Sequence, residues 1–237
     1  MTRPITAAIL TAFLCIPAMA EDKPAADRSP VPEGINDNFL NPDLNPEEWL
    51  QRFEIESREV FAGRESILKA VALQPGMSIA DVGTGTGLYM GPFSKAVGDE
   101  GRVFAVDISP KFIEHITRRI KADELHNVQP VLSNDRSITL EPEVVDRVFI
   151  CDTYHHFEFH KDMLASIRKA LKPGGELILV EFDRIPGTSR EWLLTHIRAD
   201  KATFRGEIEA AGLEFIDEVE IPEFKENYLL RFRKPAE

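Results

Sequence analysis

Cysteine is scarce in this chain. Among 237 residues there are only two, Cys15 and Cys151, and Cys15 lies in an N-terminal stretch with the features of a cleaved export signal. The mature protein would therefore keep one cysteine, which cannot form an internal disulfide. This excludes a disulfide-stapled fold and leaves the hydrophobic core to hold the structure.

Positive charge is also in deficit. Lys and Arg number 28 against 40 Asp and Glu, which gives a formal net charge of -12 and a pI of about 5.1. Proteins that bind nucleic acid need basic side chains to neutralise phosphates. The excess of acidic residues therefore argues against a nucleic-acid partner. The fraction of hydrophobic residues, 43%, is ordinary for a globular protein.

The N-terminal apolar run, residues 5–16, is shorter than the roughly 20 residues that a membrane span requires. Arg3 precedes it, and Ala18-Met19-Ala20 supplies the small-x-small pattern of a signal-peptidase site. We interpret residues 1–20 as a signal peptide and expect an exported, periplasmic protein without stable membrane insertion after cleavage. An N-terminal membrane anchor is the alternative.

The segment 21–45 contains several prolines and shows no apolar periodicity, so it is predicted to be a linker that is either disordered or draped on the surface. A helix start follows, with Asn45 as candidate N-cap and Pro46 at the first helical position. We therefore expect one domain over residues 46–237, opened by one broken helix or two consecutive helices.

Residues 78–88, S-I-A-D-V-G-T-G-T-G-L, predict a buried strand that turns sharply into a helix. The glycines permit positive φ angles and close approach of a ligand to the backbone. A dinucleotide-binding motif requires Gly or Ala three residues after Gly85, where this chain has Leu88. Asp81 would also repel a pyrophosphate, so a positively charged nucleoside ligand is favoured over NAD.

Acidic or amide side chains follow the next two predicted strands. Residues 102–108 form a short apolar strand with Asp107 near its end, where nucleotide-binding α/β folds place the acceptor of the ribose hydroxyls. Residues 128–132 form the third strand, and Asn134-Asp135 follow it. These side chains are expected at one edge of the sheet.

A fourth buried strand, residues 144–153, delivers Asp152 and the histidines that follow to the same edge. His155 and His156 are candidate general bases, because imidazole titrates near neutral pH. Adjacent residues on an extended segment point in opposite directions, so we expect only one of the two to face the cleft.

The later segments complete the predicted fold. Strands alternate with helices and end in a C-terminal antiparallel pair, which predicts an α/β protein with a doubly wound, seven-stranded, mostly parallel sheet. The remaining predicted elements are a helix over 161–171, a strand over 176–182, a largely helical stretch over 190–211, and strands over 213–221 and 227–233.

At this point the sequence resembles the class I S-adenosylmethionine (SAM)-dependent methyltransferases, whose first motif is D/E-x-G-x-G-x-G. Asp107, Asn134-Asp135 and the L-K-P-G-G turn at 171–175 follow in the family's order. The similarity spans about residues 46 to 234 and is nearest in character to the small-molecule branch that includes quinone C-methyltransferases. The segment Asp152-Thr153-Tyr154-His155 departs from the N/D-P-P-Y of amino and base N-methyltransferases.

The resemblance implies a Rossmann-like fold and SAM as cofactor, with the glycine loop around its methionine part and Asp107 on its ribose. The residues implied or predicted to bind the cofactor are Asp81, Gly83, Thr84, Gly85, Gly87, Asp107, Ile108, Asn134, Asp135 and Asp152. Tyr154, His196 and Arg198 are predicted to contact the substrate, and His155 and His156 to act as catalytic base.

We therefore expect a SAM-dependent methyltransferase that acts on a small molecule. The alternative is an exported module of this fold that binds SAM, a nucleoside or a protein partner without turnover. A zinc site from His155, His156 and His160 lacks thiolates and the i, i+4 helical pairing with a glutamate, so no metal is predicted. The acceptor, its reacting atom and the oligomeric state stay open.

Overall fold

The computed structural model describes residues 28–236, and the predicted signal peptide lies outside them. No helix in this range is long and apolar enough to cross a bilayer. The helices are α1 (Asp37–Leu40), α2 (Pro46–Phe53), α3 (Glu59–Ala62), α4 (Arg64–Val71), α5 (Met90–Val97), α6 (Pro110–Ala122), α7 (His160–Ala170), α8 (Glu191–His196) and α9 (Lys201–Ala210), with a 3-10 turn, η2 (Tyr154–His156). The strands are β1 (Ser78–Val82), β2 (Arg102–Asp107), β3 (Val128–Leu132), β4 (Val145–Cys151), β5 (Leu171–Phe182), β6 (Glu214–Glu218) and β7 (Asn227–Arg233).

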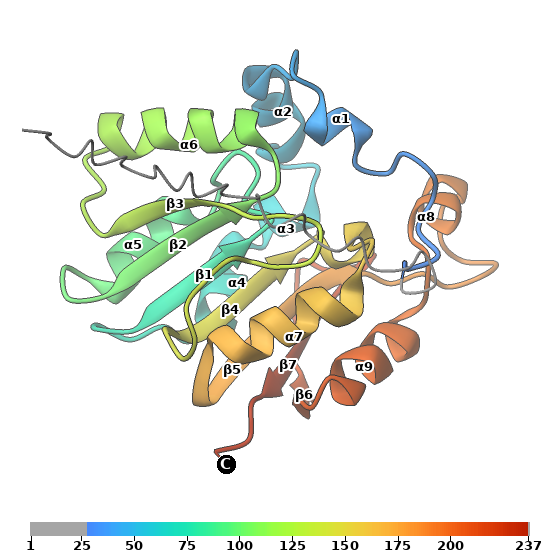
Figure 1. The fold of residues 1–237 in the computed structure, drawn as a ribbon. Coiled ribbons are helices and arrows are strands. Elements are labelled where there is room, and N and C mark those ends of the chain that lie inside the picture. The colour runs from blue at the N-terminus through green and yellow to red at the C-terminus, as the bar shows by residue number, and fades with distance from the viewer. Residues whose placement is uncertain (1–27, 237) are drawn as a thin grey trace, which may run out of the picture.

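The seven strands form one sheet in the order β3-β2-β1-β4-β5-β7-β6 (Figure 1). The strands β1 to β5 pair in parallel, and β7 runs antiparallel to both β5 and β6. The predicted doubly wound sheet with a C-terminal antiparallel hairpin is confirmed.

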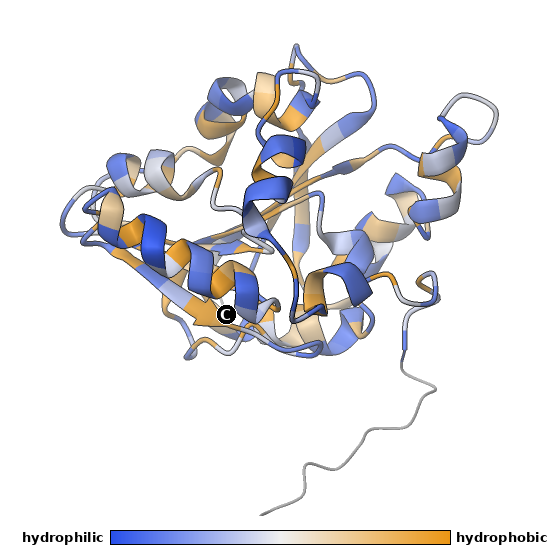
Figure 2. Ribbon diagram, turned by 90° about the horizontal axis from the view of Figure 1, so that it is seen from above, coloured by the Kyte–Doolittle hydropathy of each residue, from blue (hydrophilic) through white to orange (hydrophobic). Residues whose placement is uncertain are grey.

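Two hydrophobic cores lie on opposite faces of this sheet. Along β1, Ile79 belongs to one core and Ala80 to the other, because successive side chains of a strand point to opposite faces. Helices α4, α5 and α6 cover the first face through Ile67, Phe93 and Ile116, and helices α7 and α9 cover the second through Leu164 and Phe204. Figure 2 shows the same layering, with orange residues along the strands and alternating colours on the outer helices.

The strand order reverses between β1 and β4. The chain leaves β1 toward β2 and β3 and then returns to the other side of β1 to form β4. Open α/β sheets bind ligands at such a reversal, outside the carboxyl ends of the strands. The topology therefore places a ligand site where β1, β2 and β4 end.

The described part of the segment 21–45 packs against the domain. Ile35 and Leu44 are buried, and the side chain of Asn36 donates to the backbone oxygen of His156 at 3.1 Å. Arg28 forms an ion pair with Glu158 at 2.8 Å. Residues 28–45 therefore lie on the surface of the domain, which is the second of the two predicted alternatives, and they include the short helix α1.

Glu59 ties the N-terminal helices to the far end of the sheet. Its Oε2 accepts hydrogen bonds from the backbone N–H groups of Lys225, Glu226 and Asn227, at 2.8, 2.9 and 3.1 Å. Hydrogen bonds to an ionised carboxylate are stronger than those between neutral groups. This cluster holds α3 against the start of β7.

The substitution Glu59→Gln is expected to lower the free energy of unfolding by about 1–2 kcal/mol, because the charge behind three hydrogen bonds is lost. Urea unfolding followed by circular dichroism would measure it. Glu65→Gln is the control, since Glu65 is exposed on the neighbouring helix α4. Equal unfolding midpoints for the two variants would contradict this role of Glu59.

Candidate functional site

The glycine loop after β1, residues 83–87, packs closely against the end of β2 and against Thr153, which follows β4. The backbone N–H groups of Gly83 and Thr84 both donate to the oxygen of Val106 in β2, at 2.8 and 3.1 Å. Gly83 has a φ of 75°, and a Cβ at this position would lie 2.3 Å from Cγ2 of Thr153. No side chain fits there, so this glycine is required by both conformation and space.

Asp107 joins the loop to the end of β2. Its Oδ2 accepts from the N–H of Gly85 and its Oδ1 from the N–H of Ser109, both at 2.8 Å. Burial raises the pKa of this carboxyl group to about 6, although the backbone hydrogen bonds oppose the shift. Each carboxylate oxygen has a further lone pair, so both can also accept from ligand hydroxyl groups.

Asp81, at the end of β1, is the second buried acid of the site. Its Oδ2 accepts from the hydroxyl of Thr84 at 2.7 Å. Burial raises the pKa of Asp81 to about 7, and the nearby charge of Asp107 adds to the rise. A positively charged ligand beside these acids would stabilise their ionised forms.

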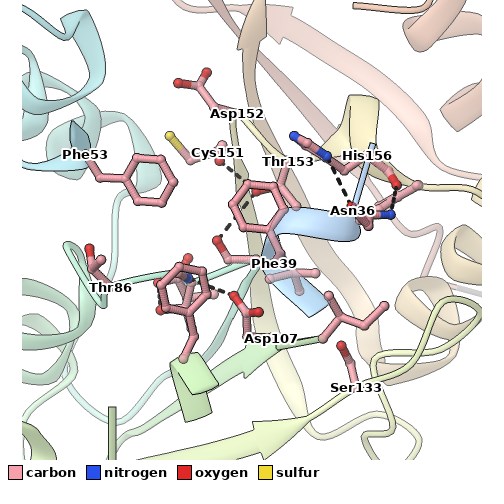
Figure 3. A pocket seen from close by; sticks show the side chains of 18 of the residues that line it. Asn36, Phe39, Phe53, Thr86, Asp107, Ser133, Cys151, Asp152, Thr153 and His156 are labelled. Atoms are coloured by element: carbon pink, nitrogen blue, oxygen red, sulfur yellow. Dashed lines mark hydrogen bonds between the residues drawn. The ribbon is translucent and has the colours of Figure 1, made fainter. Parts of the chain in front are cut away.

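A first cavity opens over the loop at the carboxyl ends of β1, β2 and β4. Figure 3 shows Asp107 and Thr86 on one side of it, Cys151, Asp152 and Thr153 on the other, and the rings of Phe39 and Phe53 close by. The predicted residues that line it are Asp81, Gly83, Thr84, Gly85, Asp107, Ile108, Asn134, Asp135, Asp152 and His156. The structure thus brings together most of the predicted cofactor residues.

Gly87 is the predicted cofactor residue that does not line this cavity. It has a φ of 87° and its N–H donates to the oxygen of Thr84 at 2.9 Å, which closes the turn into α5. The prediction of a direct contact is corrected to a conformational role. The alternating glycine spacing did not distinguish the two roles.

Asp152 stands between the first cavity and a second one, and it lines both. Its Oδ2 accepts from Arg58 and its Oδ1 from the side chain of Asn227 at 2.7 Å. Arg58, which precedes β1, lines both cavities too. The carboxylate is therefore held by its neighbours and shapes the passage between the two spaces.

The second cavity contains the predicted catalytic histidines. His155 and His156 both line it, whereas only one was expected to face the cleft. The expectation is wrong because residues 154–156 form the turn η2, in which neighbouring side chains do not alternate as in a strand. Burial lowers the pKa of both rings well below the usual value.

Among the predicted substrate residues, His196 lines the second cavity and the other two lie elsewhere. The hydroxyl of Tyr154 donates to Oε2 of Glu207 at 2.9 Å, and its ring packs on Phe204. Arg198 forms two hydrogen bonds with the same glutamate, at 2.7 and 2.6 Å. Tyr154 and Arg198 therefore belong to a buried polar cluster, and their predicted substrate contact is corrected.

Several lining residues were missed because they precede β1. Phe39 and Phe53 line both cavities, and the rings of Phe39, Trp49, Phe53 and Phe112 form one aromatic cluster. The spacing of Trp49 and Phe53 in the sequence marked an apolar helical face but not what it covers. Asn36, which lines the first cavity, gave no signal in the sequence.

Comparison with known proteins agrees with this geometry. Residues 79–175 match the model of the family described as "Methyltransferase domain". A curated relative, the ubiquinone/menaquinone biosynthesis C-methyltransferase UbiE of Wigglesworthia glossinidia brevipalpis, is 27% identical over 111 residues, which cover 46% of this chain and 44% of that protein. These matches and the glycine loop support a class I SAM-dependent methyltransferase, with the family model covering residues 79–175. It spans about half the length or less of the first curated relatives it matches.

Solved structures show the same methyltransferase fold. A SAM-dependent methyltransferase from Aquifex aeolicus superposes with a TM-score of 0.70 at 23% identity, covering 80% of this chain and 98% of that one. Phosphoethanolamine N-methyltransferase 2 of Haemonchus contortus, solved in complex with SAM, gives 0.69 at 16% identity and covers 85% and 60%. At these identities the likeness establishes the fold.

The cofactor of this methyltransferase family is SAM, and the residues of the first cavity fit it. Gly83 and Gly85 leave the backbone bare along the cavity, and both have positive φ angles. Asp107 has lone pairs for the ribose hydroxyls. Asp81, a buried acid, suits a ligand that carries an ammonium and a sulfonium.

We predict that Asp107→Ala weakens SAM binding by about 1–3 kcal/mol, because charge-assisted hydrogen bonds to the ribose are lost. Titration calorimetry of the folded variant would measure it. Asp99→Ala, at an exposed position just after α5, is the matched control. Unchanged affinity in the Asp107 variant would remove the ribose assignment.

Affinity for SAM should fall as the pH is lowered through about 7 and then about 6, the pKa values of Asp81 and Asp107. Both pKa values are raised, so the ionised forms that attract a cation are complete only above this window and are lost below it. Calorimetry from about pH 5 to pH 8 would follow the change. An affinity independent of pH over this range would contradict the role of the two acids.

Proposed function

We propose that this protein transfers the methyl group of SAM to a small-molecule acceptor that binds in the second cavity. The observation that carries the proposal is the shared wall between the two cavities. The residues that line both are Phe39, Phe53, Arg58, Asp152 and His156. The second cavity is also larger, about 610 Å³ against about 150 Å³ for the first, which gives room for an acceptor.

SAM supplies a methyl group that is already activated by positive sulfur, so the protein mainly has to bind, align and exclude water. Phe39 and Phe53 lie at the boundary of the two cavities and shield it from solvent. Arg58 and Asp152 form an ion pair at the same boundary and present fixed charges to a polar acceptor group. These four residues would position the acceptor against the methyl group of SAM.

A ring-bearing acceptor is supported by the aromatic lining of the second cavity. Trp49, Phe182 and Trp192 contribute rings to it, and planar molecules gain contact area by packing against such rings. The name of the UbiE relative, a quinone biosynthesis C-methyltransferase, supports an acceptor of this class. We therefore propose a small molecule with an aromatic or quinone-like ring.

The histidines of the second cavity are candidates for the base that removes a proton from the acceptor. Nδ1 of His155 lies 2.9 and 2.8 Å from the two carboxylate oxygens of Glu181, so this nitrogen donates and the other ring nitrogen is the basic one. His156 lies closer to the cofactor side, since it lines both cavities. Either could accept a proton from a hydroxyl group or an acidic carbon.

We also propose that the protein is exported. The support is the N-terminal pattern alone: Arg3, the apolar run over residues 5–16 and the Ala18-Met19-Ala20 cleavage pattern. Fractionation of cells, followed by N-terminal sequencing of the mature protein, would test this point separately from activity.

Incubation of the purified protein with methyl-labelled SAM and a small-molecule extract of the periplasm should transfer label to a compound soluble in organic solvent. Asp81→Asn should reduce the transfer at least about tenfold, because the buried negative charge beside the cofactor is lost, and Asp99→Asn serves as control. SAM binding without transfer to any fraction would favour the alternative of a binding module without turnover. Absence of SAM binding would remove the methyltransferase proposal.

A further inference from the structure

Three histidines from two distant parts of the chain meet in the second cavity. His155 and His156 belong to η2, and His196 is the last residue of α8. One ring nitrogen from each lies within 4.8 Å of the others. The ring centroids are 4.3, 5.1 and 5.3 Å apart, so the three imidazoles lie against one another.

Hydrogen bonds fix which nitrogen of His155 is free. Both oxygens of Glu181 already accept backbone N–H groups, Oε2 from His155 at 3.2 Å and Oε1 from Phe182 at 2.8 Å, so the geometry favours Glu181 as acceptor and Nδ1 of His155 as donor. Glu181 is fully buried, and these hydrogen bonds hold its orientation. Nε2 of His155 is then the ring nitrogen whose lone pair is free to bind a ligand.

The same argument applies to His156. The amide nitrogen of Asn36 donates to the backbone oxygen of His156 and to Oε1 of Glu158, both at 3.1 Å, which fixes the orientation of this amide. Its oxygen lies 3.2 Å from Nδ1 of His156 and accepts from it. Nε2 of His156 therefore also carries a lone pair that is free to bind a ligand.

Metal-binding histidines show this pattern, in which one ring nitrogen donates to a carboxylate or carbonyl oxygen and the other binds the ion. His196 is held by stacking on Trp192, with the rings 4.8 Å apart and 19° from parallel. It is half-buried, at the end of the short helix α8.

We propose that His155, His156 and His196 bind a divalent zinc-class metal ion. Three imidazoles with an open fourth position are the donor set of catalytic zinc sites, with bond lengths of about 2.0–2.1 Å. All three residues line the second cavity, so the open position faces the space assigned to the acceptor. Glu181 and Asn36 orient the ligands as positioning residues.

From the sequence, His160 is the third histidine considered for a metal site, beside His155 and His156, and no metal is predicted. In the structure, Nδ1 of His160 is paired with the hydroxyl of Ser29 at 2.6 Å, and its Nε2 lies 3.7 Å from Glu207. His196 takes its place from 40 residues beyond His156.

Binding of the ion does not depend on the proposed methyl transfer, but its role in holding the acceptor does. An oxygen of the acceptor would occupy the fourth position, and the metal would lower the pKa of a hydroxyl group bound there. The histidines would then be ligands, and the proton of that hydroxyl group would pass to solvent water and not to a histidine.

The test uses protein produced without a histidine tag and freed of metal with a chelator. Titration with Co²⁺ should give one equivalent of binding with the intense visible bands of a four-coordinate ion, and Zn²⁺ should displace it. His196→Ala should weaken binding at least about 100-fold, and Glu181→Gln by about 10–100-fold. His126→Ala, which removes a histidine from the loop before β3, should leave binding unchanged.

Two results would overturn the proposal: absence of stoichiometric Co²⁺ or Zn²⁺ binding to the folded protein, or equal affinity in the His196 and His126 variants. His196 is half-exposed, so its loss should not prevent folding, and circular dichroism would verify this. SAM binding measured on the same samples separates the two questions, because the first cavity is expected to bind SAM with or without the metal.

Discussion

The Asp107 carboxylate is the constraint on which the site depends. It joins the glycine loop after β1 to the turn after β2, because its two oxygens accept from Gly85 and Ser109. The same group is buried and acidic, so it orders the apo loop at an electrostatic cost that a positively charged nucleoside would relieve. Loop geometry and ligand preference thus arise from one side chain.

The two cavities differ in how far apart in the sequence their lining residues lie. The floor of the first cavity comes from turns at the ends of β1 and β2, whose shape is set by their own glycines and acids. The second cavity is assembled from η2, α8 and the N-terminal helices. The cofactor side is therefore built from contiguous motifs, and the acceptor side from segments that meet only after folding.

This division explains what the sequence could predict. Gly83, Gly85 and Asp107 lie in a strand-turn-helix pattern whose spacing fixes their geometry, and the sheet follows from alternating strands and helices. Tyr154 and Arg198 looked like ligand contacts because they neighbour the histidines in sequence, yet Glu207 draws both into a buried cluster. Residues 28–45 dock through individual contacts, such as those of Asn36, that have no periodic signature.

The rarity of tryptophan has a practical consequence. The chain has two, Trp49 and Trp192, and both line the second cavity. Their intrinsic fluorescence therefore comes from indoles beside that one space, with Trp49 also packed on Phe53 at the boundary with the first cavity. The unlabelled protein carries its own optical reporter, and quenching or a shift in emission would reveal occupancy of this pocket in a simple titration.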